Sequence, residues 1–446
     1  MKNIYLETYG CQMNEYDSEL IRSILAKNQY QIVNSQEDAQ VVLLNTCAIR
    51  ENAHQKIFHR LDELKGMKRR GEVEAVGVLG CMAQSLRKDL ADRSPIVDIV
   101  AGPDSYKKLP NLLKAVFESA SKGYDFSLSE FETYADITPK RIAGVNAWLA
   151  IMRGCDNFCT FCVVPYTRGR ERSRTVESVL NEAHRIESEG FKQVTILGQN
   201  VNSYKSDGND FADLMQTLAT ETSIPRIRFT SPHPKDFPRR LLHVIADNPS
   251  LCKQIHLPLQ AGNDDVLQRM NRTYTKKEFY TLVDEIRKII PDVALTTDVI
   301  VGFSGETEAQ FEDTFEVMQN VRFDSAFIFK YSERKNTIAS RKIPDDVPEH
   351  AKTERIVRLN ELQRRISNEI NQTEIGKKAT VLIESQSKKD ANQWLGRTDQ
   401  NKGVVFSAEA KKPGDFVDVE IIRATTNTLI GEMIPQKKRS LNLLSL

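Results

Sequence analysis

The stretch RGCDNFCTFC, Arg153–Cys162, places three of the seven cysteines of this 446-residue chain within eight positions. We call them the compact triad: Cys155, Cys159 and Cys162. Three others, the spread triad, lie at nearly even intervals in the first hundred residues: Cys11, Cys47 and Cys81. Three thiolates hold three irons of a four-iron, four-sulfur cube and leave the fourth iron open to another ligand. Electron carriers usually use four cysteines, so two groups of three indicate an enzyme with two reactive clusters.

The composition is that of an ordinary globular protein, with 40% hydrophobic and 28% charged residues, and the length allows two or three domains. No run of 18 apolar residues occurs, so we expect no membrane span. The N-terminal stretch carries Glu7 among its apolar residues and is typical of a strand, not of a signal peptide. An odd cysteine count without such a signal favours metal ligands or thiols in a reducing compartment, and we expect a cytoplasmic protein. The net charge of +1 means that any basic surface must be local.

The first region, residues 1–120, alternates short apolar runs with helical patterns, as a parallel α/β sheet does. The predicted strands are Asn3–Tyr9, Gln40–Leu44 and Glu74–Leu79. One cysteine of the spread triad follows each of them. Because the carboxyl ends of parallel strands meet at one edge of a sheet, where ligands collect, we expect the three thiols to converge there. Residues 121–140 lack periodicity and are predicted to be a connector.

The central region, residues 141–372, is predicted to be a partial barrel of six βα units, two short of the closed form. Its predicted strands are Ala147–Arg153, Gln193–Leu197, Arg226–Thr230, Gln254–Leu259, Ala294–Val301 and Ser325–Tyr331. Helical patterns separate them, and an amphipathic helix, Glu349–Asn371, follows. The compact triad comes directly after the first strand, which predicts a cluster at the mouth of the barrel.

The last region, residues 374–437, changes to short β runs, which predicts a small β-barrel and completes an α/β chain of three domains. The runs are Ala379–Glu384, Gly403–Ser407, Phe416–Ala424 and Thr428–Ile434. Residues 375–446 hold 12 lysines and arginines against 8 acidic residues. This excess fits an RNA-binding module, and it equally fits a solvated charged face.

The form of the compact triad, C-x3-C-x2-C, resembles the signature of the radical S-adenosylmethionine (SAM) enzymes. Further stretches resemble the methylthiotransferases of that superfamily: Thr8–Asn14, Asn45–Arg50, Leu79–Cys81, Cys162–Arg170, Leu197–Asn202 and His256–Gln260. The last region resembles their RNA-binding TRAM domain. Gln12–Asn14 and Ile49–Ala53 resemble the MiaB type, which acts on tRNA. Two places depart from the family pattern, since Ser304 replaces a proline and Tyr331–Thr337 lacks the usual Pro-Gly; we assign residues 331–339 no role.

The resemblance implies a radical SAM cluster on the compact triad, which is catalytic, and an auxiliary 4Fe–4S cluster on the spread triad. A radical from SAM would remove the C2 hydrogen of N6-dimethylallyladenosine in the tRNA anticodon loop, and the auxiliary cluster would deliver sulfur. A second SAM would supply the methyl group. The implied partners are the anticodon stem-loop and an electron donor such as flavodoxin or ferredoxin, and we expect a monomer.

Other residues are candidates for cofactor and substrate contacts. The resemblance assigns Gly198, Gln199 and Asn200 to the methionyl part of SAM. Phe161 is a candidate for the adenine, or for the core. A cofactor or substrate role and a satisfied core position remain equally open for three polar residues, His256, Gln260 and Asp298.

Four arginines alternate in the loop after the compact triad, and we predict that this basic strip contacts RNA phosphate, the alternative being a solvated loop. They are Arg168, Arg170, Arg172 and Arg174. The seventh cysteine, Cys252, is predicted to be a small buried hydrophobe.

Three alternatives stay open. The same chemistry could act on threonylcarbamoyl-adenine in tRNA or on an aspartate of ribosomal protein S12. A non-catalytic RNA-binding protein could instead use zinc or iron–sulfur as a structural staple, although zinc sites usually pair two halves with a fourth ligand, and no such half lies near the compact triad.

Overall fold

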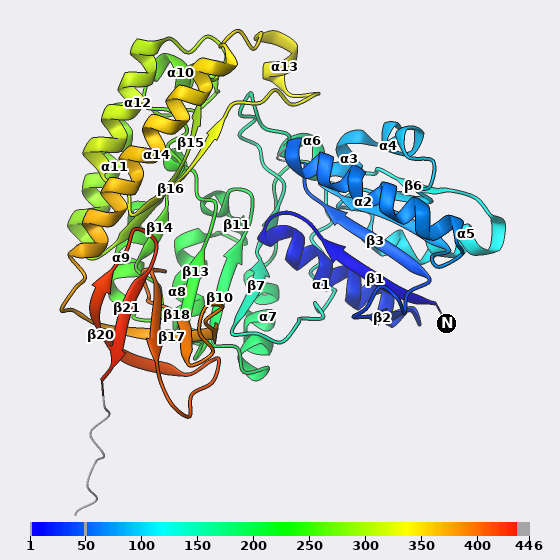
Figure 1. The fold of residues 1–446 in the computed structure, drawn as a ribbon, viewed down its shortest axis with the longest axis horizontal. Coiled ribbons are helices and arrows are strands. Elements are labelled where there is room, and N and C mark those ends of the chain that lie inside the picture. The colour runs from blue at the N-terminus through cyan, green and yellow to red at the C-terminus, as the bar shows by residue number, and fades with distance from the viewer. Residues whose placement is uncertain (1, 49–50, 435–446) are drawn as a thin grey trace, which may run out of the picture.

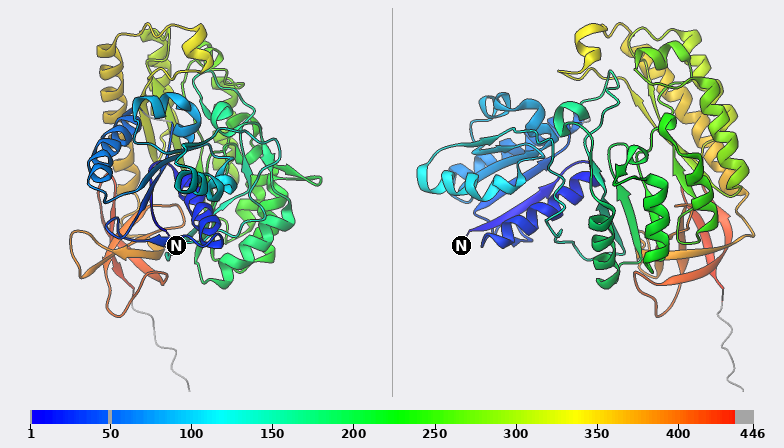
Figure 2. Two further views of the ribbon diagram at one scale, coloured as in Figure 1. Left: turned by 90° about the vertical axis from the view of Figure 1, so that its right-hand side faces the viewer. Right: turned by 180° about the vertical axis from the view of Figure 1, so that it is seen from behind.

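The computed structural model describes residues 2–48 and 51–434, and it has three parts (Figure 1). An N-terminal α/β domain packs against the side of a central half-barrel, and a small β-barrel lies at one end of that core (Figure 2). Within the described ranges no helix combines the length and the apolar character needed to cross a bilayer. The Ile49–Arg50 part of the sequence motif lies outside the described residues.

The N-terminal domain is a six-stranded parallel sheet in the order β2-β1-β3-β4-β5-β6. Its strands are β1 Asn3–Thr8, β2 Gln31–Val33, β3 Val41–Thr46, β4 Ala75–Gly80, β5 Ile99–Ala101 and β6 Gly123–Asp125. Its helices are α1 Gln12–Lys27, α2 Glu51–Arg69, α3 Cys81–Leu86, α4 Lys88–Arg93, η1 Tyr106–Lys108 and α5 Leu109–Ser119. The three predicted strands are confirmed as β1, β3 and β4.

The predicted connector, residues 121–140, is wrong at its start, because Gly123–Asp125 pairs with β5 and extends the sheet. A strand of three residues is too short to display a period of two, so the sequence pattern could not reveal it.

The core contains all six predicted strands, β7 to β16, as two three-stranded parallel sheets. A bridge between Ile227 and Leu251 links the two sheets into one open half-barrel. The principal strands are β7 Asn146–Ala150, β10 Gln193–Leu197, β13 Arg226–Phe229, β14 Gln254–His256, β15 Ala294–Val301 and β16 Ser325–Lys330. Short pairs are β8 Met152–Arg153 with β9 Arg172–Ser173, and β11 Lys205–Ser206 with β12 Asn209–Asp210.

Helices cover the outside of the half-barrel and leave part of its inner wall open to solvent. The helices of the core are α6 Val164–Arg168, α7 Val176–Ser188, η2 Val201–Ser203, α8 Phe211–Glu221, η3 Pro234–Asp236, α9 Arg239–Asp247, α10 Asp264–Arg269, α11 Lys276–Ile289, α12 Glu308–Val321, α13 Ile338–Lys342 and α14 Glu349–Gln372, of which α6 packs against the N-terminal domain. Along β15 the residues facing these helices, such as Leu295 and Val299, are fully buried. The alternate residues Thr296 and Asp298 are half-buried and face the open interior, as a strand with a period of two requires.

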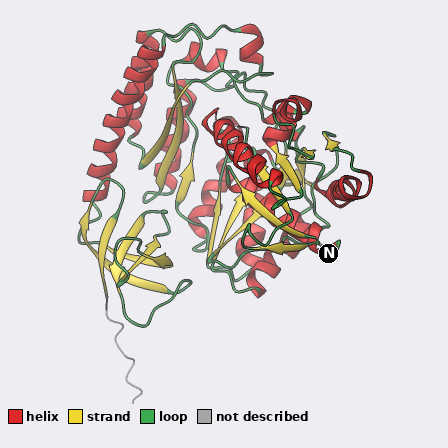
Figure 3. Cartoon of the chain, turned by 45° about the vertical axis from the view of Figure 1, so that its right-hand side comes forward, coloured by secondary structure: helices red, strands yellow, loops and turns green. Residues whose placement is uncertain are grey.

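The C-terminal part is a closed barrel with the strand order β17-β18-β19-β21-β20, and α14 leads into it (Figure 3). Its strands are β17 Lys378–Gln386, β18 Gln393–Arg397, β19 Gly403–Ser407, β20 Phe416–Ala424 and β21 Leu429–Met433. Arg226 and Arg228, at the start of β13, donate to four barrel carbonyls, those of Thr380, Arg397, Thr398 and Asp399. The barrel therefore sits at the amino ends of the core strands, opposite the end that carries the compact triad.

The N-terminal domain and the core share one buried interface. Ala150 and Leu197 of the core belong to the same apolar cluster as Tyr16 of α1. Arg174 of the core donates to Glu182 at 2.6 Å, and the Tyr16 hydroxyl also donates to this carboxylate at 3.4 Å. The ion pair is almost completely buried. This pair lies within the core, and the Tyr16 hydroxyl reaches it from the N-terminal domain, so apolar contacts and this hydrogen bond join the two parts.

Glu182→Gln is expected to lower the free energy of unfolding by about 3–5 kcal/mol, because it leaves the buried Arg174 guanidinium without its countercharge. The effect is measured by anaerobic urea denaturation of the whole chain. Glu177→Gln is the matched control, since Glu177 is exposed on the same helix, and its effect is expected to be about 1 kcal/mol or less. Equal losses in the two variants would contradict the interpretation of the Arg174–Glu182 pair as a stabilising buried ion pair.

Candidate functional site

The compact triad lies on a loop between β8 and α6 whose start is held by close backbone contacts. Gly154 has φ of +81°, and a Cβ there would lie 1.9 Å from the Arg170 carbonyl oxygen. Its amide donates to Gln199 Oε1 at 2.6 Å. Only glycine fits this approach, and the predicted SAM-binding Gln199 is thereby brought beside the triad.

Each thiol of the compact triad is buried or nearly so, and none forms a disulfide. Burial raises the pKa values of Cys155 and Cys162 to about 12, so both are protonated thiols unless a metal displaces the proton. Arg272 donates from Nη1 to Cys159 Sγ at 3.3 Å. Three buried or nearly buried thiols beside a cationic donor fit the ligand set of an iron–sulfur cluster.

Arg272 was missed by sequence reasoning, and its surroundings make it notable. Its other donors meet the neutral oxygens of Tyr274 and Pro258, and in the described chain it forms no ion pair with a carboxylate. A buried guanidinium needs a countercharge, which the thiolates of a bound cluster would supply. His233 was also missed. Its buried Nε2 has no hydrogen-bond partner in the described part, and desolvation and the Arg272 charge lower its pKa to about 2, so it is neutral.

The spread triad converges at the carboxyl edge of the N-terminal sheet, as predicted from the strand ends. Cys11 caps α1, Cys47 follows β3, and Cys81 begins α3. A Cβ on Gly10 would lie 2.6 Å from Cys47 Cβ, so the loops of Cys11 and Cys47 are in close contact. The hydrogen bond from Cys47 and the charge of Arg168 lower the pKa of Cys11 to about 6, which makes it a thiolate at neutral pH.

The two triads are neighbours through α6. Val163 directly follows the compact triad, and its side chain packs with Ala48 and Cys81 in one buried cluster. Arg168, at the other end of α6, acts electrostatically on Cys11 and Cys81. The half-barrel therefore presents the segment after one triad to the thiols of the other.

The side chains of the described residues in the two triads do not close on a single point. Among residues 2–48 and 51–434, no three His, Cys, Asp or Glu side chains are arranged around one ion. Cysteines that hold a cube surround an object several ångströms wide, whereas the ligands of zinc close on one point at about 2.3 Å.

The other predicted cofactor residues fall into two places. Gly198 and Asn200 lie with Gln199 at the end of β10, near the compact triad; Asn200 donates to Asp236 at 3.2 Å, and its buried Oδ1 has no hydrogen-bond partner in the described chain. Phe161 packs edge-to-face on Phe303, with ring centroids 6.4 Å apart.

His256 and Asp298 meet on the inner wall of the half-barrel, with Nε2 and Oδ2 3.2 Å apart. Gln260 is buried after β14, where its backbone bonds to Asp298 and Ile300. Phe327 of β16 stands beside His256, with ring centroids 6.4 Å apart, and is 57% exposed. Sequence reasoning missed Phe327, because Ala326, Phe327 and Ile328 are all apolar and their exposure alternates only in the structure.

The predicted basic strip is wrong for three of its four arginines, because they are buried and ion-paired, two of them across the domain interface and one within the core. Arg168 pairs with Asp17 at 2.8 Å, Arg172 with Asp104 at 3.0 Å, and Arg174 with Glu182. Two of these partners come from distant parts of the chain and one comes from the next helix. The loop pattern predicted exposed positive charge, but these pairs keep the three guanidiniums away from solvent. Arg170 is exposed, pairs with Asp156 and lies over Phe158, and its phosphate contact stays a prediction.

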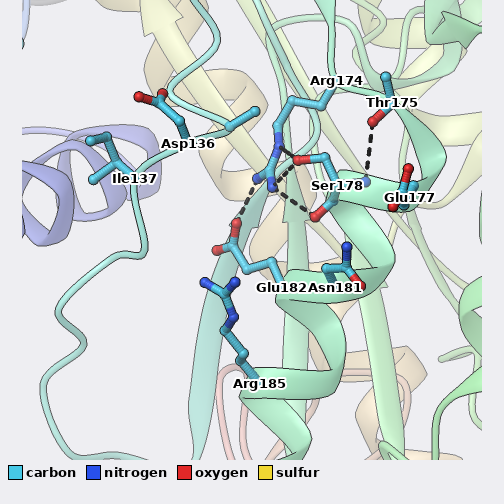
Figure 4. Close-up of a pocket in the computed structure, with 10 residues that line it drawn as sticks. Asp136, Ile137, Arg174, Thr175, Glu177, Ser178, Asn181, Glu182 and Arg185 are labelled. Atoms are coloured by element: carbon cyan, nitrogen blue, oxygen red, sulfur yellow. Dashed lines mark hydrogen bonds and ion pairs between the residues drawn. The ribbon is translucent and has the colours of Figure 1, made fainter.

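Figure 4 shows Arg174 pointing to Glu182 and Ser178 at the edge of a cavity of about 370 Å³. The lining residues come from the connector, from α7 and from Arg174 and Thr175 just before it, and they include neither a cysteine nor a predicted SAM contact. This cavity belongs to the domain interface and not to the chemistry.

Comparison with known proteins divides the chain into the same three parts. Residues 3–102 match a family described as uncharacterized protein family UPF0004. Residues 149–318 match the radical SAM superfamily, and residues 372–434 match the TRAM domain.

Relatives match nearly the whole chain. A tRNA-2-methylthio-N(6)-dimethylallyladenosine synthase from Chloroherpeton thalassium is 48% identical over 433 residues, which is 97% of this chain and 96% of the relative. The protein of that name from Porphyromonas gingivalis is 46% identical over 442 residues, covering 97% and 95%.

Solved structures share the fold at low identity. The radical SAM methyltransferase TsrM from Kitasatospora setae has a TM-score of 0.56 and 13% identity, covering 74% of this chain and 73% of its own. The cobalamin-dependent radical SAM enzyme OxsB has a TM-score of 0.55 and 12% identity, covering 82% and 56%.

Proposed function

This chain belongs to the family of tRNA-2-methylthio-N(6)-dimethylallyladenosine synthases, and we propose that it replaces the C2 hydrogen of N6-dimethylallyladenosine in tRNA by a methylthio group. Membership in the radical SAM superfamily implies a 4Fe–4S cluster and SAM. The finer proposal is that each cysteine triad holds one cluster. The observation that carries it is the packing of the spread triad against the segment that follows the compact triad.

The two clusters, when bound, supply one electron for the cleavage of SAM and the sulfur that enters the product. The chain's own residues hold and orient the reactants. Gln199 fixes the start of the triad loop, and the unpartnered Oδ1 of Asn200 would accept an N–H from the methionyl amino group. Phe161 would pack against the adenine of SAM. An external one-electron donor such as flavodoxin or ferredoxin would reduce the protein, which we propose acts as a monomer.

The adenine substrate would enter through the open side of the half-barrel. There Phe327 presents an exposed ring beside His256 and Asp298, on the wall that the helices leave uncovered. Anticodon-loop bases can be splayed out and stacked on aromatic rings, and the His256–Asp298 pair offers polar groups to the edge of a base. The basic C-terminal barrel would hold the RNA backbone.

Phe327→Ala is expected to reduce kcat/KM for tRNA by roughly 5- to 100-fold, because stacking of one base on an aromatic ring contributes about 1–3 kcal/mol. SAM cleavage without tRNA should stay unchanged. Phe131→Ala is the control, since Phe131 is 87% exposed on the connector and has no place in the proposed site. An unaltered kcat/KM in the Phe327 variant would remove this ring from the substrate site.

The function is tested with anaerobically reconstituted protein, a chemical reductant, SAM and tRNA that carries N6-dimethylallyladenosine. The expected product is the 2-methylthio nucleoside, identified by mass spectrometry after digestion of the tRNA. Parallel reactions contain tRNA with threonylcarbamoyl-adenine and ribosomal protein S12. A product in either of those reactions, with none from the prenylated tRNA, would overturn the assignment.

A further inference from the structure

A buried ionic network at the domain interface contains more positive than negative charge. Asp17 pairs with Arg153 at 2.9 Å and with Arg168 at 2.8 Å, and Asp104 pairs with Arg172 at 3.0 Å. All five side chains are buried, so three guanidiniums face two carboxylates. Buried charge is costly unless it is compensated, so the third guanidinium needs an anion other than these two carboxylates.

Arg168 is the member of this network that borders the spread triad. Its Nη2 is used by Asp17, but its buried Nη1 has no hydrogen-bond partner in the described part of the chain. Its charge acts on both Cys11 and Cys81, and Val163, near the start of the same helix, packs on Cys81. With only 3% of its surface exposed, Arg168 cannot reach RNA phosphate, so the sulfur centre is the anion within its reach.

We propose that Arg168 is a positioning residue of the spread-triad cluster, to whose sulfur atoms it donates from Nη1 and whose negative charge it compensates. The inference rests on the proposed function, because it requires a cluster on Cys11, Cys47 and Cys81. Reduction adds negative charge to a cluster, so a fixed positive charge and an N–H···S bond raise its reduction potential. Because Arg168 comes from the core while the thiols come from the N-terminal domain, this contact also ties the cluster to the SAM-binding part.

The test is an anaerobic redox titration followed by electron paramagnetic resonance, in full-length protein whose compact triad is replaced by alanine so that one cluster is observed. Arg168→Gln is expected to disfavour reduction at least tenfold, which lowers the one-electron midpoint potential by about 59 mV. Arg168→Lys keeps the positive charge but loses the paired N–H donors of the guanidinium. Its midpoint potential should therefore lie between that of the parent protein and that of Arg168→Gln.

Arg172→Gln is the matched control, because Arg172 belongs to the same network but donates to Asp104 and to backbone carbonyls. It should leave the potential unchanged. A wild-type potential in Arg168→Gln, or an equal shift in Arg172→Gln, would overturn the inference while leaving the cluster in place. Loss of iron from both Arg168 variants, with retention in Arg172→Gln, would support the contact. Absence of a cluster from the parent protein would overturn the proposed function as well.

Discussion

Replacing Cys155, Cys159 and Cys162 together by alanine is expected to abolish the cleavage of SAM and with it the modification of tRNA. The reason is that acid–base catalysis cannot convert the aromatic C2–H bond into a C–S bond. The reaction needs a radical, and the cofactor must supply it. Formation of 5′-deoxyadenosine should fall by roughly a thousandfold, to the assay background, because no partial route remains. Iron content should fall to about half, since the other triad is untouched.

Cys252→Ala is the control for this loss. Cys252 is buried beside Arg226 and Arg228, far along the chain from both triads, and the variant should keep its iron and its activity. Continued production of 5′-deoxyadenosine by the compact-triad variant would contradict the assignment of these cysteines as the radical centre. Measuring product and iron in the same sample separates a missing cluster from a misfolded chain.

The positions of the spread-triad cysteines in the fold could be predicted because each depends only on the strand that precedes it in the sequence. Each thiol of the spread triad follows a strand, and parallel strands end at one edge, so convergence of Cys11, Cys47 and Cys81 follows from the order of the elements alone. The same logic gave the six core strands. It failed for β2, β5 and β6, whose three residues are too few to show a period, and for β18, whose sequence Gln-Trp-Leu-Gly-Arg does not alternate.

The arginines after the compact triad show where such logic ends. A basic strip in sequence predicts exposed charge, but Arg168 finds its partner 151 residues earlier, in Asp17, and Arg172 finds Asp104 across the interface. Whether these charges are buried depends on how the two domains pack together, and that packing produces no periodic pattern in the sequence of either domain. Arg272 was missed for a related reason, because its contact with Cys159 lies within the core but joins residues 113 apart in sequence.

Replacing Cys11, Cys47 and Cys81 together by alanine is expected to separate the two halves of the reaction. The radical centre keeps its three ligands and its Arg272 contact, so the cleavage of SAM should continue at a rate within about a factor of ten of the wild type. The 2-methylthio product should disappear, because the proposed source of sulfur is gone. The measurement counts 5′-deoxyadenosine and the modified nucleoside in one reaction.

Two controls decide how the loss of product is explained. In this variant Arg168 lies beside a site that has lost its thiolates. A urea titration should therefore first show that the free energy of unfolding, and with it the packing of the two domains, is retained. Protein substituted at Cys47 alone then tests the ligand count, because two thiolates hold a cube far less well than three, and product should fall nearly as far as in the triple variant. Methylthiolation by a triple variant that contains only four irons would show that sulfur reaches the adenine without the spread triad, and the proposal of a second cluster would have to be abandoned.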